Sequence, residues 1–516
     1  MPENLALIGA ILRLPLTDEP TKIMMYSALA HDDPFLHHMV LYYSAQVDDI
    51  PVTEESFREW GIHFENKFLR EYYEKFKTAE KVTAFNERRE LMALLTVRKK
   101  DVRNKTILDL GLAHPSSLVR RAAVQWVGEE RLVDFRPQVT AILDDPAITA
   151  DLFLATLAAL EMLDGIPPQE FDMTPPGKYV IPIVRNKIRP AAVRALALRL
   201  VPPDDPALDG ELLANLLTTD DLALKRETIR TLNASPVPQA AELLRGIVKN
   251  DQQPLADRIE ATAGLASSAA GLDQKSLETL ADLTYGSPAQ FGTDLYIEAL
   301  RSLRGVAGKD ATLDLMLSRL GPLSPPTTPA ELDLAEQLSF ALVGSRYGLE
   351  APIAQAIAER RPKTAEEWLS ELEGEGNAER GRRVFYHSNS AGCFKCHTFD
   401  GRGGKIGPDL TNFGRNATPE KVLTSILTPS KEIAPQFTTW TLVDKDGRTY
   451  SGMIVHENEG KTLIGDAEGK LTELPTIDII ERVAQKVSIM PEKLIDKLTV
   501  QELRDLVAFL RNAPND

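Results

Sequence analysis

At 516 residues the chain is too long for one hydrophobic core, so we expect two to four domains. Two cysteines exclude a disulfide framework, and no run of about 18 apolar residues suggests a membrane span. The net charge of −16 belongs to residues 1–375, because residues 376–516 hold 19 basic and 19 acidic side chains; such an acidic surface disfavours nucleic acid and anionic membranes as partners.

The first predicted helix covers the short apolar run from Leu5 to Leu16. Glu3 stands where a secretory leader would carry basic residues, and no small-residue cleavage site follows. We therefore interpret this run as a helix of the fold. The chain is expected either to be cytoplasmic or to be a piece of a longer exported polypeptide.

Amphipathic helical phrases recur between residues 110 and 305. Arg194, Arg226 and Arg258 occupy the same place in three of them, at spacings of 32 and 32. Apolar residues fall at i, i+3, i+4 and i+7, and Pro, Asp and Gly fill the breaks. One helical hairpin cannot bury its apolar face alone, whereas a stack can. The pattern predicts a HEAT-like α-solenoid, which we assign to residues 1–370.

The composition changes after residue 376, and "ELEGEGNAERG" at 371–381 is the expected boundary. A helix, "NAERGRRVFYH", is followed by a Gly-rich loop and by period-2 runs that predict an antiparallel β-meander of three or four strands at about 437–475. Thr499 and Glu502 form a capping box that opens the last helix. Its apolar face consists of Leu503, Leu506, Val507 and Leu510.

Both cysteines lie in "CFKCH", where Cys393 and Cys396 are followed directly by His397. C-x-x-C-H is the attachment sequence of c-type haem: the thiols bind the vinyl groups and the histidine ligates the iron. Further cysteines in an oxidising compartment would risk wrong disulfides. The motif therefore predicts one covalent haem c and accounts for the sparing use of cysteine.

Two other interpretations of the cysteine pair stay open. A zinc site would need two further ligands, which would have to be histidines such as His387 and His456. A thioredoxin-like redox pair would begin a helix after a βαβ strand, but here a helix and a loop come first.

An electron-transfer haem needs a sixth iron ligand that stays bound in both oxidation states, and a thioether raises the potential. Met490 in "VSIMPEKL" precedes the last helix and is the preferred candidate. Met453 alternates with strand residues and is expected to pack inside the sheet. His456 and an open site are further alternatives.

The segment after the haem motif is rich in glycine. Gly401, Gly403 and Gly404 are expected to let the backbone pass close to a flat macrocycle. The carbonyl of Pro408 is placed to accept a hydrogen bond from the free ring nitrogen of His397, which would fix the ring and raise its basicity as a ligand.

The order of "GNAERGRRVF", "CFKCH", "GGKIGPDL", "DGRTYSGMIVHENEG" and "VSIMPEKL" resembles the haem-binding cytochrome c domains of Planctomycetes and Verrucomicrobia. The resemblance covers residues 376–516. It implies a class I cytochrome c-like helical domain with a β insertion, covalent haem at both cysteines, His397 and Met490 as iron ligands, and Pro408 in support of the histidine. It also implies that Gly381 and Phe385 cross Leu506 and Phe509.

The expected function is one-electron transfer by a monohaem c-type cytochrome in the periplasm or another exported location, with a redox protein as partner. The solenoid would offer the docking surface, and segment 371–516 is expected to keep its haem spectrum without 1–370. No nucleophile–base pair is recognisable, so no substrate chemistry is assigned. Alternatives are the cytochrome module of a quinoprotein dehydrogenase-like enzyme, a haem peroxidase, and a binding protein with a structural haem.

Overall fold

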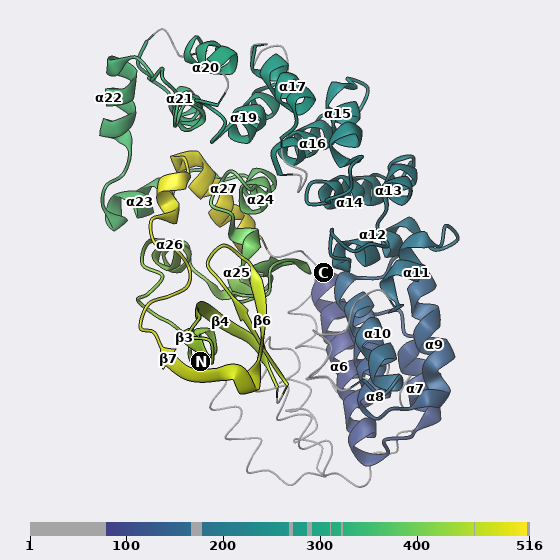
Figure 1. Cartoon of the computed structure of the whole chain (residues 1–516). Helices are drawn as coiled ribbons and strands as arrows, with labels where there is room; N and C mark the ends of the chain where they lie inside the picture. The colour runs from purple at the N-terminus through teal and green to yellow at the C-terminus, as the bar shows by residue number, and fades with distance from the viewer. Residues whose placement is uncertain are drawn as a thin grey trace, which may run out of the picture. The chain divides into compact units, whose positions relative to one another are not determined.

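The computed structural model describes residues 79–166, 178–267, 272–285, 292–309, 311–320, 324–458 and 460–512 (Figure 1). The predicted helix over Leu5–Leu16 lies outside them. The chain divides into two compact units between Leu196 and Ala197. The prediction of a mainly helical chain with a small antiparallel sheet near its C-terminus is confirmed.

The first unit is helical in its described part. Helix α8 packs against α6, α7 and α10, and the Trp126 side chain of α8 is fully buried, with Nε1 donating to the Val102 carbonyl at 2.9 Å. The helices are α6 (Ala79–Lys100), α7 (Lys105–Leu112), α8 (Ser117–Glu129), α9 (Arg136–Ala141), α10 (Ala150–Leu163), α11 (Val180–Arg185) and α12 (Ala191–Leu200), the last of which crosses into the second unit.

The second unit begins with further helices, of which α14, α16, α19 and α21 form a row in which each packs on the next. The helices are α13 (Gly210–Leu217), α14 (Leu222–Leu232), α15 (Ala240–Lys249), α16 (Leu255–Ser267), α17 (Gln274–Tyr285), α19 (Thr293–Ser302), α20 (Ala311–Ser318), α21 (Pro329–Ala341), α22 (Ala351–Arg360) and α23 (Ala365–Glu371).

The arginine repeat noticed in the sequence has a structural counterpart. Arg258 donates from Nε to the carbonyl of Val248, at the end of the preceding helix, at 3.0 Å. Arg194, in the first unit, makes the same bond to Val184 at 3.0 Å. Arg226 instead pairs with Asp257 at 3.1 Å. Arg194 and Arg258 therefore make equivalent contacts with the helix that precedes their own, whereas Arg226 does not.

The C-terminal part of the second unit is built on two crossing helices, α24 (Ala378–Tyr386) and α27 (Val500–Arg511). Gly381 makes the crossing possible, because a Cβ there would lie 1.8 Å from the carbonyl oxygen of Asp505. The rings of Phe385 and Phe509 lie 5.6 Å apart in the same core. The expected crossing is therefore present, and α27 opens with the predicted Thr499–Glu502 capping box.

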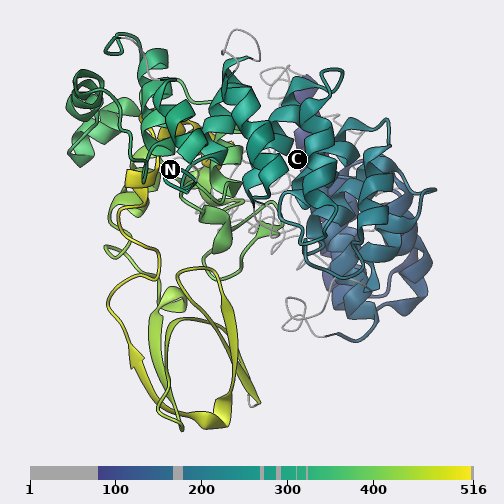
Figure 2. The same cartoon turned by 45° about the horizontal axis from the view of Figure 1, so that its top comes forward.

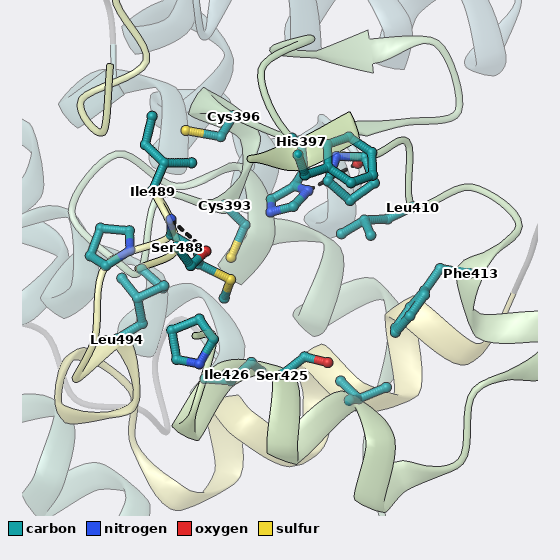
Figure 3. A pocket seen from close by; sticks show the side chains of 18 of the residues that line it. Cys393, Cys396, His397, Leu410, Phe413, Ser425, Ile426, Ser488, Ile489 and Leu494 are labelled. Carbon is teal, nitrogen blue, oxygen red and sulfur yellow. Dashed lines mark hydrogen bonds between the residues drawn. The ribbon is translucent and has the colours of Figure 1, made fainter. Parts of the chain in front are cut away.

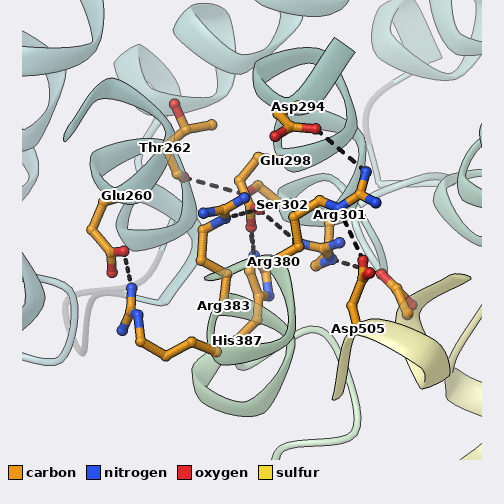
Figure 4. A network of polar contacts seen from close by, with 12 residues as sticks. Glu260, Thr262, Asp294, Glu298, Arg301, Ser302, Arg380, Arg383, His387 and Asp505 are labelled. Atoms are coloured by element: carbon orange, nitrogen blue, oxygen red, sulfur yellow. Dashed lines mark hydrogen bonds and ion pairs between the residues drawn. The ribbon is translucent and has the colours of Figure 1, made fainter. Parts of the chain in front are cut away.

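A row of buried glutamates attaches helices α14, α16, α19 and α21 to this C-terminal part. Glu227, Glu260 and Glu298, on α14, α16 and α19, pair with Arg402, Arg382 and Arg383 respectively. Figure 4 shows Glu298 with Arg383. Glu336 of α21 accepts from the backbone N–H of Val500 at 3.0 Å. The compact unit thus runs across the boundary expected at 371–381.

The larger sheet has five strands in the order β6-β5-β4-β3-β7, where three or four were predicted. They are β3 (Thr439–Asp444), β4 (Thr449–Glu457), β5 (Lys461–Gly465), β6 (Leu471–Pro475) and β7 (Ile479–Ala484). The edge strands β6 and β7 are joined by three residues, which span at most about 14 Å. A flat sheet would separate them by roughly 19 Å, so the sheet curls around Leu442, Ile464 and Leu474 (Figure 2).

Candidate functional site: an apolar cavity at the cysteine motif

A cavity of about 560 Å³ lies in the C-terminal part, and every residue that lines it belongs to 385–510. Most of the wall is apolar; it includes Phe385, Leu410, Phe413, Val422, Ile426, Leu494 and Leu506. Figure 3 shows Cys393 and His397 on one side and Ile426, on α26 (Pro419–Leu427), on the other. The volume is typical of pockets for small molecules and cofactors, which measure about 300–1,000 Å³.

Cys393, Cys396 and His397 face the cavity together because the backbone turns tightly at this point. Gly392 adopts φ +69° and the 3₁₀ turn Cys393–Lys395 follows. The N–H groups of Cys396 and His397 both donate to the Cys393 carbonyl, at 3.2 and 3.0 Å. Side chains three positions apart eclipse in a 3₁₀ turn, so both thiols lie on one side.

The His397 ring is fixed in one tautomer. Its Nδ1 lies 2.9 Å from the Pro408 carbonyl oxygen, which can only accept a hydrogen bond, so Nδ1 carries the proton and Nε2 keeps a free lone pair. Burial lowers the pKa of His397, and the bond to Pro408 opposes this. The hydrogen bond expected from the sequence is therefore present, and Nε2 is the ring atom left to bind a metal.

Gly407 also fits the ring to its place. A Cβ on this residue would lie 2.7–2.8 Å from Cε1 and Nδ1 of His397, so only glycine allows the ring to lie against the backbone. Its N–H donates to the Cys396 carbonyl at 2.7 Å. Gly407 was not singled out from the sequence; its position directly before Pro408 is the signal that could have indicated it.

The glycines that were expected beside the cofactor have another role. Gly401, Gly403 and Gly404 do not line the cavity. A Cβ on Gly403 would lie 2.2 Å from the His397 carbonyl oxygen, and one on Gly404 would lie 2.1 Å from that of Lys395. The expectation for these residues was wrong, because two of them make room for the turn that carries the cysteine motif.

Both cysteines are free thiols whose environment keeps them protonated. Burial raises the pKa of the Cys393 thiol to about 12. Burial, followed by the charge of Asp466, raises the pKa of Cys396. A redox-active nucleophilic cysteine requires a lowered pKa. The thiol environment therefore argues against the thioredoxin-like alternative.

Two methionines line the cavity. Met490 lies on the loop between β7 and α27, as expected, and its N–H donates to Ser488 Oγ at 3.1 Å. Met453, 5% exposed on β4, also lines the cavity and is absent from the sheet's own core of Leu442, Ile464 and Leu474. The expectation that Met453 packs inside the sheet was therefore wrong, because it lies on the cavity side of β4.

The two histidines considered as zinc ligands lie away from the cysteine pair. His387 is fully buried and contacts Ser302, and His456 at the end of β4 contacts Asn458. Neither lines the cavity. Among the residues described, no three His, Cys, Asp or Glu side chains come together as metal ligands. The four ligands that a structural zinc site needs are not assembled in this part of the chain.

The sequence was compared with protein-family models and with curated proteins. No family model matches the sequence, and no curated protein matches it. Within the described ranges, every helix is too short or too polar to cross a membrane.

Proposed function

We propose that this chain is a monohaem c-type cytochrome that transfers single electrons. One observation carries the proposal: Cys393, Cys396, His397 and Met490 line one apolar cavity, and Pro408 leaves Nε2 of His397 free to bind iron. Two thiols, an imidazole and a thioether are the set of groups that haem c requires. The finer description of the fold, a class I cytochrome c-like domain after HEAT-like repeats, belongs to the same proposal.

In this proposal Cys393 and Cys396 hold the haem through thioether bonds, while His397 and Met490 hold its iron. The iron supplies a reversible one-electron exchange when bound. The protein's residues then exclude water, because the wall is largely apolar, and Met490 raises the reduction potential as a thioether ligand. Attachment of this kind places the working protein outside the bacterial cytoplasm, in the periplasm or another exported location.

The redox partner would approach the cavity rather than the inner helices of the repeat region. Glu227, Glu260 and Glu298 are buried and already paired, so a partner cannot use them. A docking role for the repeat region is therefore confined to its outer surface. Exposed charged side chains line the cavity with more lysines than glutamates: Lys395, Lys421, Lys431, Lys497, Glu432 and Glu468. This excess of positive charge favours a partner that is acidic at its contact surface.

The test is covalent retention of haem. The chain, fused to an export leader and produced with haem-maturation machinery, should keep its haem after acid–acetone extraction. Cys393→Ser with Cys396→Ser should lose it, whereas Lys395→Ala, a control between the two cysteines, should keep it. Haem that leaves the native sequence on extraction would overturn the proposal.

A further inference from the structure

The loop 485–490, which ends at Met490, is held in place by backbone hydrogen bonds from Gln485 and Ser488. At its start, Gln485 donates from its N–H to the Thr439 carbonyl at 2.8 Å, which extends the pairing of β7 with β3. Three residues later, the N–H of Ser488 donates to Ser430 Oγ at 3.1 Å. The five-residue stretch between the sheet and Met490 is therefore tied to two different parts of the unit.

Ser430 belongs to the turn that follows α26, the helix on the wall opposite Cys393. This turn is itself closed by the Lys431 N–H, which donates to the Thr428 carbonyl at 3.0 Å. Ser488 and Met490 are half-buried at the edge of the cavity, where Figure 3 shows Ser488 beside Ile489. A chain of two hydrogen bonds, from Met490 N–H to Ser488 Oγ and from Ser488 N–H to Ser430 Oγ, thus joins the methionine loop to the cavity wall.

A thioether is a neutral iron ligand, and an external ligand can replace it only when its loop opens. The free energy of that opening includes the loss of hydrogen bonds that hold the loop closed. One net hydrogen bond of this kind changes an opening equilibrium by roughly three- to tenfold. The two serines are therefore placed to control how firmly Met490 stays at the iron.

We propose that Ser488 and Ser430 are positioning residues that hold the Met490 thioether at the haem iron and set the rate at which external ligands displace it. This inference rests on the proposed function. Neither serine needs to touch the cofactor, because each acts through the backbone of the loop. The inserted sheet takes part in the same task, since β7 leads into the loop and Gln485 fixes its start.

The experiment measures how fast imidazole displaces Met490 in the oxidised, covalently loaded full chain, followed by the loss of the Fe(III)–thioether band at the near-infrared edge. Ser488→Ala and Ser430→Ala should each accelerate displacement about fivefold. Ser488→Thr, which keeps the acceptor oxygen, should exchange at the rate of the native sequence. The matched control is Ser425→Ala: Ser425 lines the same cavity, but its hydroxyl donates only to Lys421 of its own helix, at 2.8 Å.

The outcomes separate the inference from the proposed function. Unchanged displacement rates in both serine-to-alanine variants, with a thioether band that Met490→Ala abolishes, would overturn the positioning role. A loss of thermal stability without faster displacement would overturn it as well, since that is the result of a merely structural contact. Loss of haem from the native sequence on acid–acetone extraction would instead refute the proposed function.

Discussion

Arg301 on α19 and Glu502 on α27 form an ion pair of 2.6 Å in which both side chains are at most 2% exposed. Arg304 pairs with the same carboxylate at 2.7 Å, and Gln337 donates to it at 3.1 Å. Burial alone would raise the pKa of Glu502, but Arg304 and Arg301 hold it at about 2. The buried, ionised carboxylate of Glu502 thus joins α27 to α19 and α21.

Glu502→Gln should lower the free energy of unfolding by about 3–5 kcal/mol, because buried Arg304 loses its paired carboxylate and Arg301 keeps only Glu298. Urea unfolding at neutral pH measures this. Glu481→Gln, at an exposed position on β7, is the control and should change stability by less than about 0.5 kcal/mol. Equal effects of the two substitutions would show that the buried pairing contributes nothing.

Deleting residues 1–371 should prevent the C-terminal part from folding cooperatively, contrary to what the sequence suggested. Arg382, Arg383 and Arg402 would lose the glutamates that neutralise them. A chain that begins at residue 186 keeps these glutamates and should retain a sharp thermal transition and its haem. The comparison uses thermal unfolding and haem retention of both truncated chains. A cooperative, haem-retaining 372–516 fragment would contradict the expectation.

Stability should fall as the pH drops from 6.5 to about 4, because burial lowers the pKa of His387 from 6.5 to about 4. The folded protein favours the neutral ring: Nδ1 accepts from the Asn389 N–H at 3.0 Å. The contribution is complete above pH 6.5 and is lost progressively down to about pH 4, a change of roughly 3 kcal/mol.

His387→Gln cannot take up a proton and should flatten the pH dependence of urea unfolding in that window. His456→Gln, on the sheet, should leave the dependence as it is. A second loss is expected in both variants between pH 4.5 and about 2, because Glu227 and Glu502 take up protons from about pH 4.5 in the unfolded chain but only near pH 2 in the folded one. An unchanged slope in His387→Gln would mean that this ring does not control acid stability.

The two cavity methionines should respond differently to substitution. Met490→Ala should abolish the thioether band and lower the reduction potential, because the thioether is the proposed sixth ligand. Met453→Ala should keep the band and cost about 2–5 kcal/mol of stability, since Met453 is buried on β4. Spectra in the near-infrared and a redox titration of each variant decide this; the reverse pattern would make Met453 the ligand.

The lysines at the cavity should accelerate electron exchange with an anionic probe. Lys395→Glu, Lys431→Glu and Lys497→Glu should each slow oxidation of the reduced protein by ferricyanide, because they weaken the attraction at the cavity mouth. The effect should shrink as salt shortens the screening length to about 8 Å and below. Lys470→Glu is a matched control, since Lys470 is exposed but does not line the cavity. Equal stopped-flow rates in all four variants would argue against an electrostatic role for these lysines.

The sequence allowed the elements with strong local signals to be predicted. Helix α27 begins at its capping box, α24 covers "AERGRRVFY", and β3 to β6 coincide with the period-2 runs. Strand β7 was missed because "IIERVA" does not alternate cleanly: it is an exposed edge strand that pairs with β3 rather than with its neighbour in sequence, β6. Five of the six residues of β7 are exposed, so neither face is buried and nothing selects alternating apolar and polar residues.

The sequence predicted those residues of the candidate site whose side-chain chemistry and spacing match a known haem-attachment motif. The cysteine motif, Pro408 and Met490 all line the cavity, as the spacing and residue types suggested. The buried glutamates were not foreseen, since Glu260 and Glu298 read as ordinary polar positions of amphipathic helices. Their burial depends on a segment more than 80 residues away in sequence, which no local pattern reports.

Helix α24 makes two sets of contacts with different residues: one set lines the cavity and the other binds the preceding helices. Phe385 on this helix borders the cavity, whereas Arg382 and Arg383 on the same helix pair with α16 and α19. Substitutions, insertions or added repeats between residues 197 and 371 therefore change no residue of the cavity lining, provided that the paired glutamates are kept. Under the proposed function, such a chain could acquire new partners through these helices without retuning the haem site, and exchange of the helices between related chains is a practical route for engineering it.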